Sequence, residues 1–150
     1  MIVTVHVASG GLLGALAGTR RRALALGPLA HVVGDWIPHG DLPSRRFEVV
    51  SGTFGVLLLA AARGPSDPAV VGSISAALPD AEHLLRLPRP DGRKLFPSHR
   101  FHGWHRSGGV STRAQLVVAG VLLGALAASG VGAQGAVGRK SSSSSPPAAM

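Results

Sequence analysis

One run of uncharged residues near the end of the chain limits the possible folds more than any other feature. Residues 114–138 contain no charged side chain over 25 positions. With a rise of about 1.5 Å per residue, a helix of this length exceeds the roughly 30 Å hydrocarbon thickness of a bilayer. The run is therefore the best candidate for a membrane-spanning helix.

Four further apolar segments precede this run. They cover residues 2–18, 23–37, 47–62 and 68–79. Glycine, proline or arginine closes each of them, so we predict separate helices. The first and third are at the short limit for crossing a bilayer, and they suit spanning, re-entrant or buried helices equally. At 150 residues the chain has the length of one domain.

Small residues recur at helical spacing in two of these segments. Gly10, Gly14 and Gly18 follow one another every four residues, and Gly120 and Gly124 do the same. Such stripes allow helix backbones to approach closely. We predict that both stripes are faces on which helices pack.

The positive charge of the chain is dispersed. Fifteen Lys and Arg residues against seven Asp and Glu residues give a net charge of +8. A nucleic-acid interface would collect basic residues into a patch. Here they lie mostly at the edges of apolar segments, as at residues 20–22 and 45–46, which is typical of anchors for anionic lipid headgroups. Membrane lipid is therefore the predicted partner, and nucleic acid is not.

The composition also indicates a membrane protein. Charged residues make up 15% of the chain, against roughly 25% in average soluble domains. Hydrophobic residues make up 45%, and the mean hydropathy is +0.30. We predict a membrane location, either a prokaryotic-type inner membrane or a plasma membrane. The chain has no cysteine, which excludes disulfides and thiolate metal ligands.

Six of the seven histidines fall into three short clusters that also hold acidic residues. The clusters are His31-Val-Val-Gly-Asp35-Trp-Ile-Pro-His39, Pro79-Asp80-Ala-Glu82-His83 and His99-Arg-Phe-His102-Gly-Trp-His105. Imidazole and carboxylate are the ligands that divalent cations such as zinc take where thiolates are missing. A site for one or two divalent metal ions is therefore the leading hypothesis.

Residue spacing within the clusters fits shared ligands. His31 and Asp35 are four residues apart, and Asp80 and His83 are three apart, so each pair shares a face if the segment is helical. The histidines of the third cluster recur every third residue. This spacing would keep them on one broad face of a helix or 3₁₀ turn.

Three histidines are harder to place. His39 follows Pro38, which ends the preceding helix, so the sequence leaves open whether its ring returns to the site. The sequence likewise leaves open whether His102 is a ligand. His6 stands alone on the helix face that carries Gly10; a lone histidine there is more often a hydrogen-bonded core residue, but imidazole inside a membrane bundle is a candidate functional group.

These motifs resemble those of the small predicted membrane-bound metal-dependent hydrolases, a family distantly similar to the zinc-dependent phospholipases C. The resemblance covers roughly residues 1–130. Its motifs are His6-Val-Ala-Ser-Gly10, then His31 and Asp35 followed by Pro38-His39, then Leu78-Pro79-Asp80 with His83, and finally His99-Arg100 with His105-Arg106-Ser107. The resemblance implies an all-α bundle around a zinc-type site. By analogy it also implies hydrolysis of a phosphoester or lipid-derived substrate.

We therefore expect a compact all-α helical bundle, partly membrane-embedded, over residues 1–138. A disordered Ser/Pro-rich tail is expected over residues 139–150. The expected metal ligands are His6, His31, Asp35, Asp80, His83, His99 and His105. The expected ion is zinc.

The expected reaction uses metal-activated water. Asp35, Asp80 or Glu82 would accept its proton, and Arg100 or Arg106 would compensate the charge of a small-molecule or lipid ester substrate. Two alternatives stay open. The same ligands would serve a non-catalytic membrane protein that binds or transports metal, which a closed cage of donors would favour. A structural membrane protein with hydrogen-bonded histidines would instead leave the donors far apart.

Overall fold

Helices dominate the part of the chain that the computed structural model describes, which is residues 1–85 and 87–142. In chain order they are α1 (Val3–Ala17), α2 (Arg20–Trp36), α3 (Arg45–Arg63), α4 (Pro68–Ala77), the 3₁₀ helices η1 (Leu78–His83) and η2 (Pro90–Gly92), α5 (Pro97–Arg100) and α6 (Thr112–Ser142). The described residues form no strand beyond isolated bridges. The predicted all-α class is confirmed.

The ends of α2 follow local sequence signals. Its first turn includes the three arginines because Thr19 Oγ1 accepts a hydrogen bond of 3.4 Å from Arg22 N and so caps the helix. The helix ends at Trp36, and Ile37 is extended with φ −72° and ψ 125°. Pro38 disfavours helical geometry in the residue before it. The predicted exit of the chain at this proline is confirmed.

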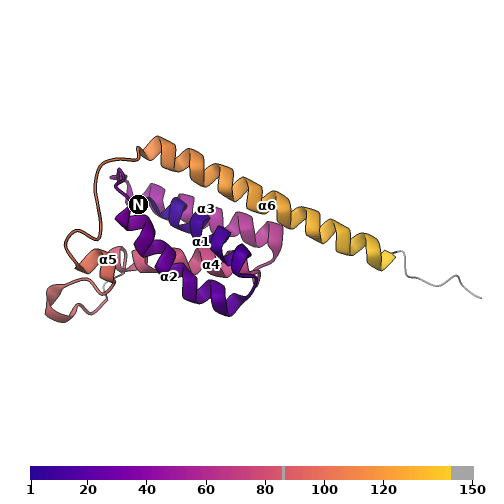
Figure 1. Ribbon diagram of the computed structural model, residues 1–150, viewed down its shortest axis with the longest axis horizontal. Coiled ribbons are helices and arrows are strands. Elements are labelled where there is room, and N and C mark those ends of the chain that lie inside the picture. Colours follow the sequence, from indigo (N-terminus) through magenta and orange to yellow (C-terminus); the bar gives the residue numbers. More distant parts are fainter. Residues whose placement is uncertain (86, 143–150) are drawn as a thin grey trace, which may run out of the picture.

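The central helix of the bundle is α1, which contacts α2, α3, α4 and α6 (Figure 1). Gly10 and Gly14 both face the backbone of α4. A Cβ atom added at Gly10 would lie 2.4 Å from the carbonyl oxygen of Gly72, so a larger residue has no room. The predicted packing face is confirmed at these two positions, whereas Gly18 caps the helix and a Cβ atom there would meet nothing within 4 Å among the described residues.

The second glycine stripe does not pack within the chain. A Cβ atom added at Gly120 or Gly124 would meet nothing within 4 Å among the described residues. Instead, α6 contacts the bundle through Ala119, Leu123 and Leu126, which are buried. The prediction that both stripes pack helices of this chain is wrong for α6.

The apolar core lies between α1, α3, α4 and α6. Val7, Leu59 and Val70 meet there with almost no exposed surface, and the buried residues of α6 close the core from one side. Burying a side chain of this size contributes about 1.5 to 3 kcal/mol relative to leaving it in water. The core therefore holds these four helices together, next to the end of the bundle where the predicted ligands lie.

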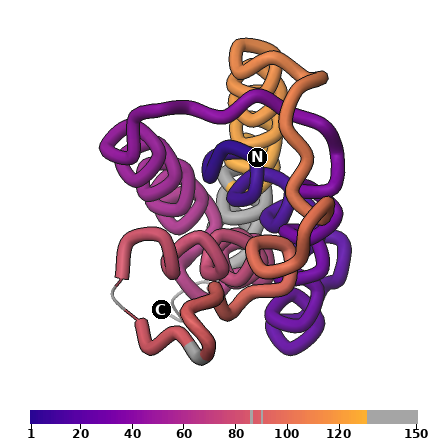
Figure 2. Tube along the Cα trace, turned by 90° about the vertical axis from the view of Figure 1, so that its left-hand side faces the viewer, coloured from indigo at the N-terminus to yellow at the C-terminus, as the bar shows by residue number. Residues whose placement is uncertain are grey.

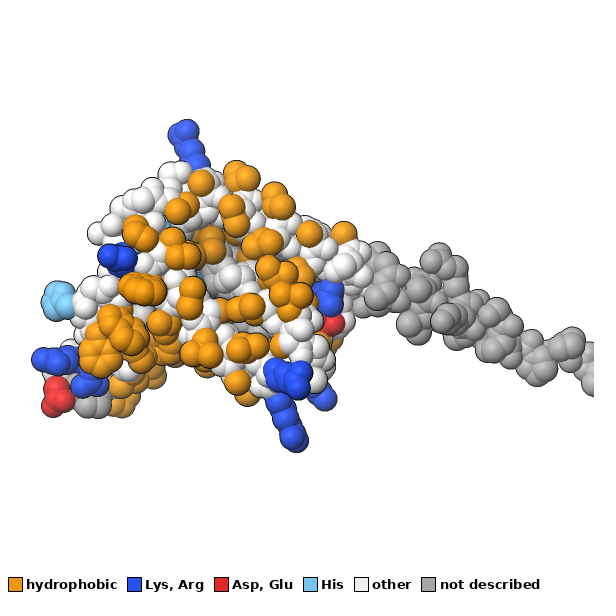
Figure 3. All heavy atoms as spheres, viewed as in Figure 1, with side chains coloured by type: hydrophobic (Ala, Val, Ile, Leu, Met, Phe, Trp, Pro, Cys, Tyr) orange, Lys and Arg blue, Asp and Glu red, His pale blue; other side chains and the backbone are white. Residues whose placement is uncertain are grey.

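Large apolar side chains also cover much of the outside. Figure 3 shows hydrophobic side chains spread over one face, with Lys and Arg side chains near its margins. Leu16, Phe54 and Val121 are among the most exposed. Within the described residues, one helix segment, Thr112–Gly130 of α6, is long and apolar enough to cross a membrane. This segment overlaps the uncharged run of residues 114–138, for which a membrane-spanning helix is predicted.

The boundary expected at residue 138 does not coincide with the end of a helix. Helix α6 continues to Ser142. The remaining residues of the expected tail, 143–150, lie outside the described residues.

Two distant segments pair at the end of the bundle beyond α2. His39 N donates to the carbonyl of Arg106 over 3.1 Å, and Val110 N donates to the carbonyl of Pro38 over 2.9 Å. Gly109 is required in this pairing because its φ is +77° and a Cβ atom would lie 2.4 Å from the Pro38 carbonyl oxygen. Figure 2 shows the segment before α6 running beside the connection from α2 to α3.

Candidate metal centre

Donor atoms from all three histidine clusters and from α1 meet at one end of the bundle. They form four overlapping groups, and within each group the donor atoms lie within 4.8 Å of one another. The groups are His6, His31 and Asp80; His31, Asp35 and His99; Asp35, His39 and His105; and Asp80, His83 and His99. All seven predicted ligands are thus brought together, and His39 joins them.

The innermost donors have the spacing of a tetrahedral site. His31 Nε2 lies 3.1 Å from Asp35 Oδ2, 3.2 Å from His99 Nε2 and 3.8 Å from Asp80 Oδ1. His99 Nε2 lies 3.4 Å from Asp35 Oδ2 and 3.6 Å from Asp80 Oδ1. Four ligands held tetrahedrally at about 2.0 to 2.1 Å from zinc are about 3.3 to 3.4 Å apart. The set of His31, Asp35 and His99 therefore has the spacing of ligands that share a divalent ion, and Asp80 Oδ1 lies within 3.8 Å of both imidazole nitrogens.

The histidine rings are held by their outer nitrogens. His31 donates its Nδ1–H to the Ala76 carbonyl over 2.8 Å, and His99 donates its Nδ1–H to Glu82 Oε1 over 2.5 Å. A carbonyl and a carboxylate only accept, so Nδ1 carries a proton in both rings and Nε2 is directed into the group, where it can bind a metal ion once it carries no proton. This is the arrangement by which proteins orient metal-binding imidazoles.

Asp35 is the buried anion at the middle of the centre. Its side chain is 1% exposed, and its Oδ2 accepts a hydrogen bond of 2.6 Å from Ser98 Oγ. Burial alone would raise the pKa of Asp35, but the imidazoles of His31, His6 and His99 outweigh it and hold that pKa well below its usual range. Asp35 is therefore an ionised ligand at neutral pH.

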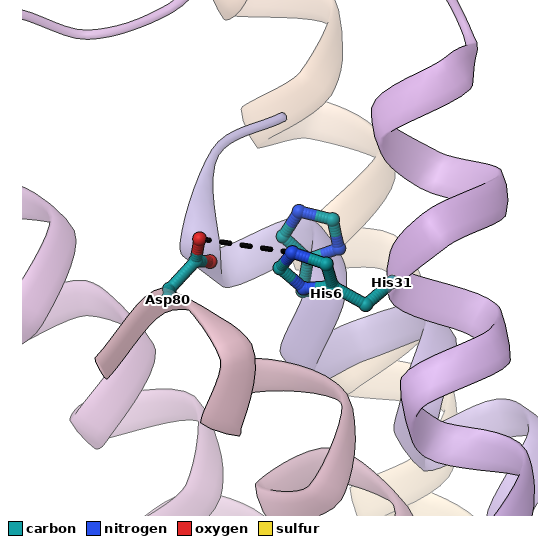
Figure 4. Close-up of side chains that lie close together, drawn as sticks. All are labelled: His6, His31 and Asp80. Carbon is teal, nitrogen blue, oxygen red and sulfur yellow. Dashed lines mark ion pairs between the residues drawn. The ribbon is translucent and has the colours of Figure 1, made fainter. Parts of the chain in front are cut away.

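His6 lies against His31 with stacked rings, whose centroids are 3.9 Å apart (Figure 4). Burial lowers the pKa of His6 to about 3, so its ring is neutral. Its Nε2 lies 3.2 Å from Asp35 Oδ1 without the alignment of a hydrogen bond. Among the described residues both ring nitrogens lack hydrogen-bond partners, as does Asp80 Oδ2. Buried polar atoms without partners are costly, and a bound cation would satisfy them.

A second donor group lies on the other side of Asp35. His39 Nε2 is 3.4 Å from His105 Nε2 and 3.1 Å from Asp41 Oδ1, while His105 Nε2 is 3.9 Å from Asp35 Oδ1. His39 donates its Nδ1–H to the Ile37 carbonyl over 2.6 Å, so this ring also turns its Nε2 inward. Asp35 thus offers one oxygen to each group, which suits two ions bridged by a carboxylate.

The α-amino group of Met1 lies in this second group. It is 3.0 Å from Asp35 Oδ1, 3.8 Å from Asp41 Oδ1 and in contact with His39 Nε2. An amino group between two carboxylates and an imidazole is favourably placed for its positive charge. A metal ion in the second group would have to displace it.

His83 stands at the outer edge of the inner group. Its ring lies 4.4 Å, centroid to centroid, from that of His99, and Lys94 Nζ is 3.1 Å from its Nδ1. Burial, followed by the charges of His99 and Lys94, lowers the pKa of His83 to about 4. The ring is neutral at physiological pH and can act as a ligand.

The structure gives Glu82 a positioning contact with His99. Glu82 Oε1 accepts the hydrogen bond from His99 Nδ1, and Glu82 Oε2 accepts hydrogen bonds from Leu95 N at 2.7 Å and Phe96 N at 3.4 Å. Burial opposes ionisation of Glu82, but the bond with His99 and these backbone donors lower its pKa overall. The carboxylate orients His99 and is fully engaged.

The third cluster does not form a single face. His99 lies in α5, whereas His102 and His105 lie in the loop that follows. His102 is exposed and takes part in none of the donor groups. The expectation that one face carries all three histidines is wrong because α5 ends at Arg100 and the chain becomes extended at Phe101.

A cavity of about 620 Å³ adjoins the donors. Asp80, His83, His99 and His105 lie at its polar end. Two basic residues that the sequence analysis missed, Arg45 and Lys94, also line it. The predicted Arg100 and Arg106 are not among its lining residues, so their role stays a prediction.

Comparison with known proteins adds no assignment. No protein-family model matches the chain, and no curated protein or solved structure matches it. The resemblance to metal-dependent hydrolases therefore stays a prediction, and the arguments for a function come from the geometry of this centre.

Proposed function

We propose that the protein is a membrane-associated metal-dependent hydrolase that holds one or two zinc-type ions and acts on a phosphoester or lipid-derived substrate. The observation that carries this proposal is the convergence of His31 Nε2, His99 Nε2 and Asp35 Oδ2 within 3.1 to 3.4 Å, with the outer nitrogen of each ring donating elsewhere. A proton on one of these nitrogens can form a hydrogen bond with only one of the other two donor atoms at a time. A divalent cation satisfies all of them together.

A bound divalent ion would polarise the scissile ester and lower the pKa of a water ligand towards neutrality. Of the three acids considered for proton transfer, Asp80 alone lines the cavity. Burial raises the pKa of Asp80, which makes its carboxylate a better proton acceptor. Asp35 offers an oxygen to each donor group, and Glu82 is occupied by His99. If Asp80 Oδ1 binds the ion, its Oδ2, which has no hydrogen-bond partner among the described residues, stays available for the proton. We assign the proton acceptor to Asp80.

Charge compensation is assigned to Arg45 and Lys94. Both line the same cavity as the donor atoms. An anionic phosphoester bound at the polar end would lie within the field of both cations and of the metal. These residues take the place that the sequence analysis gave to Arg100 and Arg106.

The cavity favours a hydrolase over a metal carrier. A site for metal binding alone closes its ligands around the ion, whereas a catalytic site keeps an open position for water or substrate. Here His83, His99 and His105 border a cavity of about 620 Å³, a size common among small-molecule sites. The membrane assignment is supported by the apolar exterior and by Thr112–Gly130.

The test compares two histidines of one cluster. Purified protein should contain one or two zinc ions per chain and should hydrolyse members of a phosphoester panel in a metal-dependent way. His99→Ala should lose at least one ion and nearly all activity, because His99 contacts the inner donors. His102→Ala is the matched control and should keep both, because His102 is exposed and outside the groups. Absence of bound metal, or equal behaviour of the two variants, would contradict the proposal.

A further inference from the structure

The cavity beside the metal centre continues away from it between three helices. Val3 and Val7 of α1 form the floor, Val49, Thr53 and Val56 of α3 form one wall, and Ile74, Leu78 and Leu84 lie on the side of α4 and η1. The floor is shared because α1 contacts both α3 and α4, which also contact one another. We call this apolar part of the cavity the α3 groove.

Close glycine contacts explain why the groove stays open. On the α3 side, a Cβ atom added at Gly52 would lie 2.7 Å from Val3 Cγ1. On the α4 side, Gly10 and Gly72 meet backbone to backbone. Both helices therefore lie close to α1, and the cavity extends between them above α1.

The groove has a polar end and an apolar end. From Arg45 to Val56, α3 advances about 16 Å at the usual helical rise. The cavity wall changes over this length from Arg45 and the metal donors to valine and isoleucine side chains. The apolar lining is accessible: Ile74 is 48% exposed and Leu78 is 64% exposed. An occupant that covers these side chains gains the free energy of removing them from water.

The charged residues that line the cavity determine which chemical group can bind at its polar end. Within the described residues neither Arg45 nor Lys94 forms an ion pair with an acid, and Lys94 Nζ lies 3.1 Å from His83 Nδ1. The same cavity is also lined by Asp41, Glu48 and Asp80, so the two cations alone do not make it positive. With a divalent ion bound at the donors, an anionic group fits the polar end, and an uncharged chain fits the remainder.

Resting on the proposed function, we infer that the substrate is an amphiphile with an anionic phosphoester head and a hydrocarbon chain that lies in the α3 groove. The head binds at the metal donors with Arg45 and Lys94. The chain extends along α3 past Thr53 towards Val56. This chain-binding groove determines specificity, because its length limits the chain that can be covered while the head remains at the donors.

The test uses the full chain, loaded with zinc, and a series of alkyl phosphates from methyl to octyl. Binding is measured separately with the matching alkyl phosphonates, which keep the anionic head but have no ester to cleave. The affinity should rise with chain length by up to about fourfold per buried methylene. The value of kcat/KM for the phosphates should rise in parallel.

Two tryptophan variants on α3 locate the chain. Thr53→Trp places a ring in the groove and should abolish the gain for hexyl and octyl compounds while methyl phosphonate binds as before. Leu57→Trp is the matched control: Leu57 is 61% exposed on the same helix and does not line the cavity, so the chain-length gain should persist. Both variants are measured in the same detergent, so partition into micelles affects them equally.

The outcomes separate this inference from the proposed function. Hydrolysis of methyl phosphate without any chain-length gain would overturn the groove and leave the hydrolase. A chain-length gain that survives Thr53→Trp unchanged would also overturn it, since the chain would then lie elsewhere. Binding of phosphonates with the expected gain but without hydrolysis of any phosphate would support the groove and contradict the enzyme.

Discussion

At the scale of single residues, His99 connects the parts of the centre. Its Nε2 lies within 3.6 Å of His31, Asp35 and Asp80, and its Nδ1 donates to Glu82. Burial lowers the pKa of His99, but the two hydrogen-bonded carboxylates outweigh it and raise the pKa overall. A metal ion at this site must therefore displace a proton, and the ring must be held while this happens.

Glu82→Ala tests the positioning role of this carboxylate. Without Glu82 the His99 ring loses its anchor, so we expect zinc affinity to fall about 10-fold to 100-fold, as for other partners that orient ligands. Glu82→Gln retains an acceptor for the Nδ1–H and should lose less. Competition with a chromogenic chelator measures the affinity. An unchanged zinc affinity in Glu82→Ala would show that the ring needs no such support.

Local spacing predicted only part of this centre. His31 and Asp35 could be paired from the sequence because four residues on a helix return to the same face. His39 could not be placed, because Pro38 determines where the helix ends and not where the chain goes next. Its position depends on pairing with residues about 70 positions later. Asp41, two residues after His39, could have been suspected from its place beside that histidine.

At the scale of elements, two similar glycine stripes behave differently. Gly10 of α1 meets the backbone of α4, whereas Gly120 of α6 meets open space. The sequence pattern is the same in both helices. The difference arises because α1 is surrounded by four helices and α6 touches the bundle along one side. A stripe predicts where a close contact is possible, and the arrangement of all helices decides where it forms.

Alanine substitutions distinguish the two stripes. Gly10→Ala forces a Cβ atom against Gly72 O and Ala76 Cβ, both 2.4 Å away, and should lower the free energy of unfolding by about 1 to 3 kcal/mol. Gly120→Ala has space and should stabilise α6 by up to about 1 kcal/mol. Thermal denaturation followed by circular dichroism measures both. Destabilisation of similar size in the two variants would contradict the assignment of packing faces.

At the scale of the whole molecule, the donors connect elements that the apolar core does not. The core joins α1, α3, α4 and α6, whereas the donor groups add the end of α2, η1, α5 and the loop after it. Bound metal would therefore hold in place short segments whose large apolar side chains, such as Phe101 and Trp104, stay exposed and add little to the core.

Chelation tests this linkage. A ligand present at a hundred times its dissociation constant stabilises the folded state by about 2.7 kcal/mol. For a chain of this size that is about 5 to 10 °C in Tm. EDTA should lower the Tm of the native protein by this amount and lower that of His99→Ala by less, because the variant lacks the ion of the inner group. A Tm of metal-loaded protein that does not respond to EDTA would mean that the ions contribute nothing to folding.

The pairing of residues 38–40 with residues 106–110 has a consequence for biosynthesis. His39 reaches the second donor group through backbone bonds to a segment just before α6, and His105 belongs to that segment itself. A ribosome must therefore translate at least as far as Val110 before the second group can form. Any metal that the second group binds would then enter only after this segment has been made, because a nascent chain that stalls earlier presents an incomplete set of ligands.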